Sequence, residues 1–207
     1  MPKEWIKKQK QDKFYIQSKE EGLRARAAYK IRQIQAKFKV ISKGNFILDV
    51  GCAPGSWIQE IKRMFEDVSI VGVDIVKMKS IEGVTFFQGD ICEDRTINNL
   101  AGILTQEIDV VISDCAPKFI GSKETDYARQ LFLVERVLYL ATQFLKEGGH
   151  LVCKLFDGKE TPKIRNELKQ IFKDSWLFKP ESSRKESPEL YIIGKYYKKT
   201  QLKIQFN

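Results

Sequence analysis

Four charged side chains stand at or just after the ends of short, mostly apolar runs in the sequence. Each run has the length and the β-branched or aromatic composition of a buried strand. In a sheet whose strands alternate with helices, the carboxyl ends of the parallel strands meet at one edge, and ligands bind outside that edge. We therefore expect a single polar site to contain Asp74, Asp90, Asp114 and Lys154.

The three carboxylates favour a nucleoside ligand. Asp74 ends the second predicted strand, where an acid can accept hydrogen bonds from ribose hydroxyls, and Asp90 can accept one from an adenine amino group. A single aspartate after a strand is weak evidence, because turns favour aspartate in any case. Three aspartates at the same edge, beside a glycine-rich turn, indicate a nucleoside site more strongly.

The glycine-rich turn follows the first predicted strand, 46–50, and runs from Gly51 to Gly55. The backbone of such a turn can approach a ligand, and the helix after it presents free N–H groups. The spacing lacks the third glycine of a dinucleotide site and the Gly-Lys-Ser/Thr of a phosphate loop. A buried Asp49 beside it suits a nucleoside without a pyrophosphate, such as S-adenosylmethionine; a structural turn in another α/β protein is the alternative. Trp57 either lines that ligand or packs in the core.

Lys154 is the residue that could carry a reaction. It follows Leu-Val-Cys at the end of a central predicted strand, and we expect it near Asp114. Burial and a neighbouring sulfonium would lower the pKa of this lysine, so that its neutral form could accept a proton from a hydroxyl group. A solvent-facing lysine in a salt bridge is the alternative.

The elements that position these residues alternate along the chain. We predict strands at 46–50, 69–74, 84–90, 108–114, 150–154, 176–179 and 190–197, and helices at 24–40, from 56, 93–106, 126–145 and 161–172. Such alternation gives an α/β fold with a doubly wound, mostly parallel sheet. Two final strands joined only by a loop predict a C-terminal antiparallel hairpin. This seven-stranded pattern is typical of the Rossmann-like S-adenosylmethionine-dependent methyltransferase fold.

The net charge of +9 is unevenly distributed. Residues 1–44 contain 13 Lys and Arg against 4 Asp and Glu, and residues 151–207 are also basic, whereas residues 45–150 are acidic. This pattern favours a small-molecule core with margins that bind a polyanion such as RNA, rather than a merely lysine-rich surface. The candidate RNA contacts on the first helix are Arg24, Arg26, Lys30 and Arg32.

Several classes of protein are excluded by composition. No apolar run is long enough to span a membrane, and the N-terminus is too polar for a signal peptide. The four cysteines are dispersed, and His150 is the only histidine, so we expect no metal site and no disulfide framework. Reduced thiols indicate a reducing compartment, and we expect a cytoplasmic protein, or an organellar or nuclear one if the source is a eukaryote.

Longer motifs identify a family. The chain closely resembles the FtsJ/RrmJ (RlmE-like) ribose 2′-O-methyltransferases over nearly its whole length. The segments that carry the resemblance are Gly-Leu-Arg-Ala-Arg-Ala-Ala-Tyr-Lys-Ile, Leu-Asp-Val-Gly-Cys-Ala-Pro-Gly-Ser-Trp, Ser-Asp-Cys-Ala-Pro, Leu-Val-Cys-Lys-Leu-Phe-Asp-Gly and Ser-Ser-Arg-Lys-Glu-Ser-Pro-Glu-Leu-Tyr-Ile-Ile-Gly.

The resemblance implies residue roles. The family's Lys-Asp-Lys-Glu tetrad carries over to Lys30, Asp114, Lys154 and Glu189, with Lys154 as the proton acceptor. Its S-adenosylmethionine contacts carry over to Gly55, Trp57, Asp74, Asp90 and Asp114, beside Gly51 of the turn.

The resemblance also implies the reaction. The expected activity is methylation of an RNA ribose 2′-hydroxyl, in a uridine of large-subunit ribosomal RNA. Methylation of the tRNA anticodon loop is the alternative, and a non-catalytic RNA-binding module is a third possibility, against which the intact tetrad argues. We expect a monomer that is one methyltransferase domain over 1–207, with a basic RNA-binding arm and helix at 1–44 and a catalytic core at 45–207.

Overall fold

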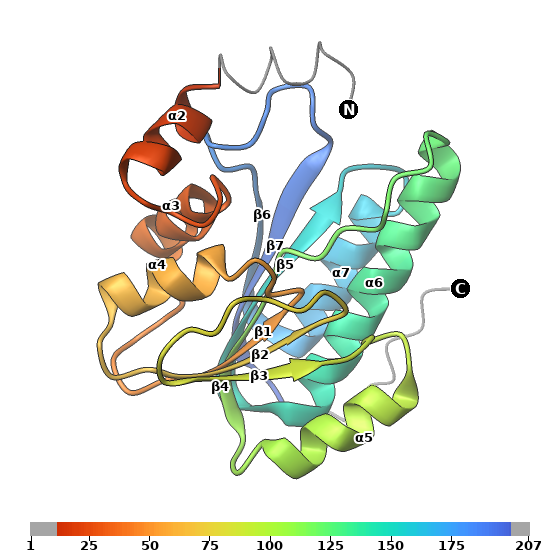
Figure 1. The fold of residues 1–207 in the computed structure, drawn as a ribbon. Coiled ribbons are helices and arrows are strands. Elements are labelled where there is room, and N and C mark those ends of the chain that lie inside the picture. Colours follow the sequence, from red (N-terminus) through yellow and green to blue (C-terminus); the bar gives the residue numbers. More distant parts are fainter. Residues whose placement is uncertain (1–11, 200–207) are drawn as a thin grey trace.

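The computed structural model describes residues 12–199; the rest of the basic N-terminal arm, residues 1–11, lies outside the described part. A central sheet runs between two groups of helices (Figure 1). Its seven strands lie in the order β3-β2-β1-β4-β5-β7-β6. Among residues 12–199, no helix is long and apolar enough to cross a membrane.

The first five strands are parallel to one another, and the last two are not. β7 lies between β5 and β6 and is antiparallel to both. This arrangement confirms the predicted mostly parallel sheet with a C-terminal antiparallel hairpin. The strands are β1 (Phe46–Val50), β2 (Ser69–Asp74), β3 (Val84–Gln88), β4 (Ile108–Ser113), β5 (Leu145–Phe156), β6 (Phe172–Phe178) and β7 (Glu189–Tyr197).

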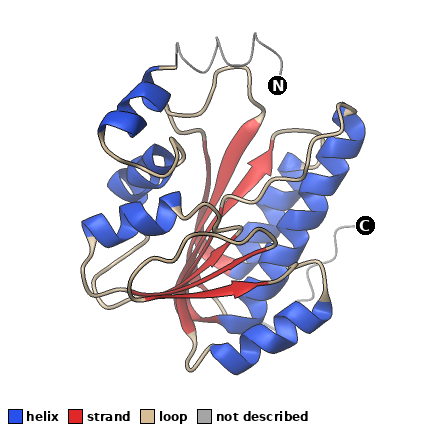
Figure 2. Cartoon of the chain, in the orientation of Figure 1, coloured by secondary structure: helices blue, strands red, loops and turns tan. Residues whose placement is uncertain are grey.

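Helices cover both faces of the sheet, as the blue and red elements of Figure 2 show. One face carries α2 (Lys13–Glu20), α3 (Ala28–Phe38) and α4 (Ser56–Met64), and the other carries α5 (Asp94–Ile103), α6 (Lys123–Phe144) and α7 (Thr161–Ile171). Each face has its own hydrophobic cluster. All five residues of β1 are buried, as expected for a central parallel strand covered on both faces.

Several element boundaries differ from those expected; β6, for example, begins at Phe172 rather than at 176. α6 begins at Lys123, three residues earlier than predicted, because the Ser122 side chain accepts a hydrogen bond from the Thr125 N–H and caps the helix. α3 begins at Ala28 rather than at residue 24. β5 begins at Leu145 rather than at 150, because the two glycines predicted to close the preceding helix lie within an irregular stretch of the strand.

The strand register brings the predicted site residues to one edge of the sheet. Val50 at the end of β1 pairs with Val73 of β2 and with Ser113 of β4, and Ser113 pairs with Cys153 of β5. The residues that follow these positions therefore lie at the same level. They are Gly51, Asp74, Asp114 and Lys154.

We predict that the packing of α3 on the sheet is a large contribution to stability. Ile34 is fully buried, so Ile34→Ala should lower the free energy of unfolding by about 2–5 kcal/mol. Urea titration of the folded protein measures this difference. Ile16→Ala, on the exposed side of α2, is the control and should change stability by less than about 0.5 kcal/mol. Equal effects of the two substitutions would contradict the prediction.

Candidate active site

Four charged side chains meet at the carboxyl edge of the sheet, and they form the predicted tetrad. Lys154 Nζ lies 2.7 Å from Asp114 Oδ1 and 3.5 Å from Glu189 Oε2. Lys30 Nζ lies 2.7 Å from Glu189 Oε2 and 3.7 Å from Asp114 Oδ1. Two positive and two negative groups alternate in space, so the tetrad is close to neutral and can remain largely buried.

The tetrad is assembled from four separate elements. Lys154 and Glu189 lie on β5 and β7, and the antiparallel register pairs Lys154 with Tyr191 and Phe156 with Glu189. Side chains of paired residues, and of residues two apart, project from the same face of a sheet, which places Glu189 beside Lys154. Lys30 reaches this face from the first turn of α3, and Asp114 from the end of β4.

Two further side chains hold the carboxylates of the tetrad. The Tyr191 hydroxyl donates a hydrogen bond of 2.5 Å to Asp114 Oδ1, and the Ser183 hydroxyl donates one of 2.7 Å to Glu189 Oε1. Lys154 Nζ also donates to the backbone carbonyl of Asp114, at 2.8 Å. Each carboxylate is therefore oriented by both a lysine and a hydroxyl group, which fixes the geometry of the tetrad.

The electrostatics of the tetrad differ from the sequence-based expectation for Lys154. Burial lowers the pKa of this lysine, but the carboxylates of Asp114 and Glu189 raise it, and the net direction is upward. Burial raises the pKa of Asp114, and the nearby Lys154 and Lys30 lower it by more. Burial alone therefore does not give a net lowering of the pKa of Lys154, and the expected lowering would require the neighbouring sulfonium. The charged form of the lysine is stabilised by its two acidic neighbours.

A cleft of about 690 Å³, here called the strand-end cleft, opens beside Asp114. It contains four of the predicted ligand-binding residues, namely Gly51, Asp74, Asp90 and Asp114. The exposed apolar residues Ile75 and Val76 form part of its wall. Acidic groups beside an apolar wall match a ligand that has hydroxyl or amino groups and an aromatic ring.

The glycine turn gives this cleft its floor. Gly51 and Gly55 have φ angles of +76° and +92°, which side chains other than glycine rarely adopt. A Cβ at Gly55 would lie 2.9 Å from Ile81 Cδ1, and one at Gly51 would collide with the Cys115 side chain. The turn can therefore adopt this conformation and pack against its neighbours only because these two positions are glycine.

Asp49 is a buried acid in β1, two residues before the glycine turn. It is 1% exposed, and its Oδ2 has no hydrogen-bond partner among residues 12–199. Burial, together with the charges of Asp114 and Asp74, raises its pKa well above the ordinary range. The neutral form of the Asp49 carboxyl group is therefore favoured more than in an exposed aspartate.

Most of the chain matches a known family model. Residues 23–197 match the model of the FtsJ-like methyltransferases. The chain belongs to the FtsJ-like methyltransferase family. This confirms the predicted family. All four residues of the tetrad, and all residues that line the strand-end cleft, lie within the matched range.

The relatives of this methyltransferase include proteins from archaea and bacteria. The ribosomal RNA large subunit methyltransferase E of Archaeoglobus fulgidus is 41% identical over 192 residues, which are 93% of this chain and 99% of the relative. The protein of the same name from Methanothrix thermoacetophila is 40% identical over 184 residues, covering 89% and 72% of the two chains.

Solved structures show the same fold. A crystal structure from Plasmodium falciparum, described as a ribosomal RNA methyltransferase, has 32% sequence identity and a TM-score of 0.76 over 84% of this chain and 98% of its own. A structure of the fibrillarin/Nop5p complex matches at 16% identity with a TM-score of 0.58, over 84% and 85% of the two chains. At that identity the second match supports the fold alone.

Trp57 lies apart from the other predicted ligand-binding residues. It is 2% exposed, its indole N–H donates to the Ala27 carbonyl at 2.9 Å, and its ring packs against Tyr191. Neither Trp57 nor Gly55, a further predicted cofactor contact, is among the residues that line the strand-end cleft. The structure therefore places Trp57 in the core, in contact with α3 and with the strand that carries Glu189, and matches the core alternative named for it.

Arg24, a predicted RNA contact, binds the protein itself. Its guanidinium donates hydrogen bonds of 2.8–2.9 Å to the carbonyls of Pro54, Lys79 and Ser80. Pro54 belongs to the glycine turn, and the other two belong to the loop after β2. Arg24 therefore joins the N-terminal segment of this methyltransferase to the two loops that border the strand-end cleft.

The other predicted RNA-binding residues are also paired within the protein. Arg32 contacts Glu21 at 2.9 Å and Glu60 at 2.7 Å, on the side of α3 that faces α4. Arg26 forms an ion pair with Asp12. The structure thus does not bring all four residues onto one free surface, because three of them hold the N-terminal segment together.

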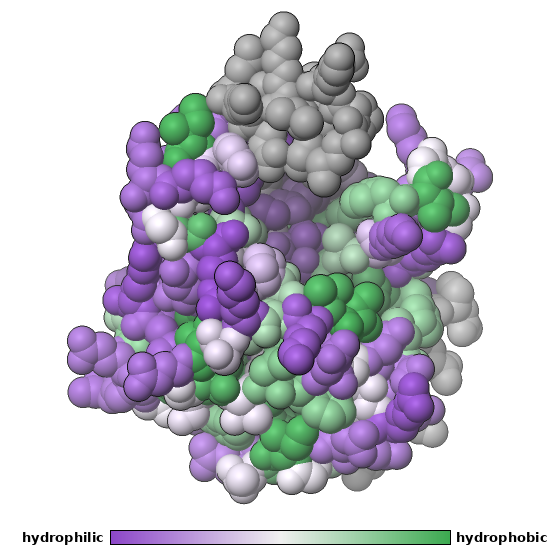
Figure 3. Space-filling view, viewed as in Figure 1, coloured by the Kyte–Doolittle hydropathy of each residue, from purple (hydrophilic) through white to green (hydrophobic). Residues whose placement is uncertain are grey.

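A small basic pocket, of about 220 Å³, adjoins the tetrad on the side opposite the strand-end cleft. Asp114 lines the cleft, whereas Lys30 and Glu189 line the basic pocket, so the tetrad lies between the two. The residues that line the basic pocket are Arg26, Ala27, Lys30, Ser183, Arg184, Ser187 and Glu189. Figure 3 shows a hollow on this face of the molecule, between α3 and α4 on one side and α6 on the other.

Three residues of the site were not singled out from the sequence: Tyr191, Ser183 and Arg184. Tyr191 lies two residues after Glu189 on one strand, so the two-residue period of β7 could have placed it on the tetrad face. Ser183 and Arg184 lie in the loop between β6 and β7, where no periodic pattern indicates direction. Within residues 12–199, no group of three or more His, Cys, Asp or Glu side chains could hold a metal ion.

We predict that Glu189 stabilises the folded protein in a pH-dependent way. Burial raises the pKa of Glu189, but Lys30 and Lys154 lower it by more, to below its ordinary 4.5. A group with a depressed pKa contributes stability above its unfolded-state pKa and loses that contribution as the pH falls through its folded-state pKa. Glu189→Gln should therefore lower the free energy of unfolding by about 3–5 kcal/mol at neutral pH.

The measurement is urea unfolding of both proteins across the acid range. The difference between wild type and Glu189→Gln should shrink as the pH falls below about 4.5. Glu186→Gln, at an exposed acid in the loop just before β7, is the control and should show little difference at any pH. A difference for Glu189→Gln that is constant with pH would contradict the assignment of an ionised carboxylate.

Proposed function

We propose that this methyltransferase transfers a methyl group from S-adenosylmethionine to the 2′-hydroxyl of a uridine in large-subunit ribosomal RNA. The observation that carries the proposal is the position of Lys154. It lies 2.7 Å from Asp114, between a cleft suited to a nucleoside and a pocket that bears basic side chains. The relatives named ribosomal RNA large subunit methyltransferase E support the RNA substrate.

S-adenosylmethionine, when bound, supplies a methyl group on a positively charged sulfur. The strand-end cleft offers groups to hold it. Asp74 accepts hydrogen bonds from the N–H groups of Ala53 and Val76, and Asp90 accepts one from Cys92, so both carboxylates are fixed in direction. Each oxygen has a second lone pair, which leaves Asp74 able to accept from ribose hydroxyls and Asp90 from an amino group.

The tetrad positions the hydroxyl group and removes its proton. Lys30 and Glu189 line the basic pocket and would hold the target ribose, while Asp114 orients Lys154. A hydroxyl group is a poor nucleophile, so the protein contributes alignment and a proton acceptor. Lys154 Nζ would accept that proton.

This role requires Lys154 to become neutral. The carboxylates of Asp114 and Glu189 raise its pKa in the protein alone. A positive charge in the strand-end cleft, which Asp114 lines, opposes the effect of these carboxylates and lowers the pKa of Lys154. The lysine would thus serve as a base only in the loaded site.

We also propose that residues 1–207 form one methyltransferase domain. The described part of the N-terminal segment packs on the sheet through α3 and supplies Lys30 to the tetrad. Basic residues of segment 1–44 and of the loop before β7 would bind RNA phosphates near the basic pocket, where Arg26 and Arg184 lie.

We predict that Asp74 is an anchor for S-adenosylmethionine. Asp74→Ala should weaken cofactor binding at least tenfold, since a hydrogen bond to a charged group is worth about 1.5–3 kcal/mol. Isothermal titration calorimetry measures the dissociation constant. Glu82→Ala, an exposed acid in the loop between β2 and β3, should bind as wild type does. Unchanged affinity in Asp74→Ala would remove Asp74 from the cofactor site.

We predict that Lys154 cannot be replaced by arginine. Arginine keeps the charge and the length but is not deprotonated in proteins, so Lys154→Arg should slow methyl transfer by about 10²–10⁴-fold while cofactor binding stays nearly intact. Single-turnover rates at saturating RNA and cofactor measure this loss, and Lys163→Arg on the exposed side of α7 is the control. A rate for Lys154→Arg within a few-fold of wild type would show that the lysine serves only as an electrostatic anchor.

A further inference from the structure

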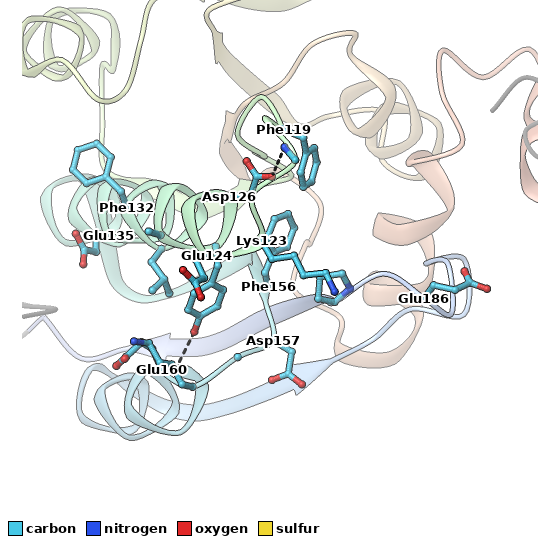
Figure 4. Close-up of a pocket in the computed structure, with 17 residues that line it drawn as sticks. Phe119, Lys123, Glu124, Asp126, Phe132, Glu135, Phe156, Asp157, Glu160 and Glu186 are labelled. Carbon is cyan, nitrogen blue, oxygen red and sulfur yellow. Dashed lines mark hydrogen bonds between the residues drawn. The ribbon is translucent and has the colours of Figure 1, made fainter. Parts of the chain in front are cut away.

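A groove of about 1110 Å³ is used by none of the proposed roles. It lies along α6 and is here called the α6 groove (Figure 4). Its apolar lining includes Phe119, Tyr127, Leu131, Phe132 and Phe156. Phe156 pairs with Glu189 of the tetrad across β5 and β7, so the groove begins next to the tetrad.

An aromatic pair occupies the end of the α6 groove nearest the tetrad. The rings of Phe119 and Phe156 are stacked, with their centroids 5.8 Å apart and their planes 18° from parallel. Phe156 is buried, whereas Phe119 is 63% exposed. A large aromatic side chain this exposed, supported from behind by a second ring, offers a flat apolar surface to a ligand.

The two walls of the α6 groove are held in place by neighbouring residues of α6. The buried Asp126 accepts hydrogen bonds from the N–H groups of Ile120 and Gly121, and so fixes the loop that carries Phe119. The Tyr127 hydroxyl accepts a hydrogen bond from the Glu160 N–H and fixes the turn after β5. The exposed ring therefore stands on a preorganised loop, which lowers the entropy cost of binding.

The α6 groove connects the two parts of the site already described. Ala128 and Phe132 line both the α6 groove and the strand-end cleft. At its other side the groove includes Glu186 and Pro188, from the loop that also carries Arg184 of the basic pocket. A chain that crosses the basic pocket and the tetrad would therefore reach Phe119 next.

We propose that the α6 groove binds a nucleobase of the RNA, next to the target ribose, by stacking on Phe119. The inference rests on the proposed function and adds a subsite to it. Bases of single-stranded RNA stack on exposed aromatic side chains, and every base has a suitable face.

The charges of the α6 groove favour a base over a phosphate group. Its lining includes two lysines, Lys123 and Lys159, and six acids, Glu124, Asp126, Glu135, Asp157, Glu160 and Glu186. Acidic side chains repel phosphates, but they can accept hydrogen bonds from the N–H groups of an uncharged base. The phosphates would instead lie at the basic pocket. A basic peptide is the other partner that such a groove could attract, and the experiment below distinguishes it.

The test compares Phe119→Ala, Phe119→Trp and the control Ile120→Ala, all in the folded full-length protein. Ile120 is exposed in the same loop but does not line the groove. The probes are fluorescein-labelled oligouridylate and an abasic ribose-phosphate oligomer of the same length, titrated at low salt. Phe119→Ala should weaken oligouridylate binding by about 5- to 150-fold, from the loss of one stacked base. Phe119→Trp should retain binding, and Ile120→Ala should change it less than twofold.

The abasic oligomer decides whether the effect is stacking. Wild type and Phe119→Ala should bind it equally, because it has no base to stack. Equal oligouridylate binding by wild type and Phe119→Ala would overturn the proposal, as would an equal loss on both probes. Phe119-dependent binding of an arginine-rich peptide without Phe119-dependent binding of oligouridylate would assign the groove to a protein partner instead. The proposed function is tested separately, by methyl transfer to ribosomal RNA in the wild type, and can hold in each of these cases.

Discussion

The structure of the site depends on the alternation of charge among Lys30, Asp114, Lys154 and Glu189. Two lysines and two acids could not be buried separately without a large desolvation cost, but each here faces a group of opposite sign. These contacts are short, so they form only if β4, β5, β7 and α3 keep their relative positions. The core beneath them, with its fully buried strands, supplies the necessary rigidity.

The same alternation separates two chemical environments. Asp114 faces the strand-end cleft, whose lining carries three acids against two basic residues, Lys118 and Arg129, whereas Lys30 faces the basic pocket. A positively charged cofactor and a negatively charged RNA would therefore each meet surroundings of complementary charge, with Lys154 at the boundary. The uneven charge along the sequence corresponds to these two environments. The acidic middle of the chain forms the strand-end cleft, and the basic ends form the basic pocket.

Much of this arrangement could be predicted from the sequence because strand ends are local signals. An apolar run followed by an acid or a lysine marks an edge position, and Asp74, Asp114 and Lys154 all lie there. Contacts between distant segments left no such signal. The fixing of Arg24 to the cleft loops depends on the folded chain, as do the exposure of Phe119 and the sign of the Lys154 pKa shift. Family motifs, rather than spacing, linked Lys30 to Glu189.

The paired arginines have a consequence for how the chain binds RNA. Arg24 and Arg32 contribute to the net charge of +9, but their guanidinium groups contact carbonyls or acids of the protein. Such residues add to the long-range field that attracts a polyanion, yet they offer few direct contacts unless existing pairs break. Because Arg24 also holds the glycine turn, pulling it onto a phosphate would loosen the strand-end cleft. Retaining it on the turn keeps the cofactor site intact while RNA binds next to it.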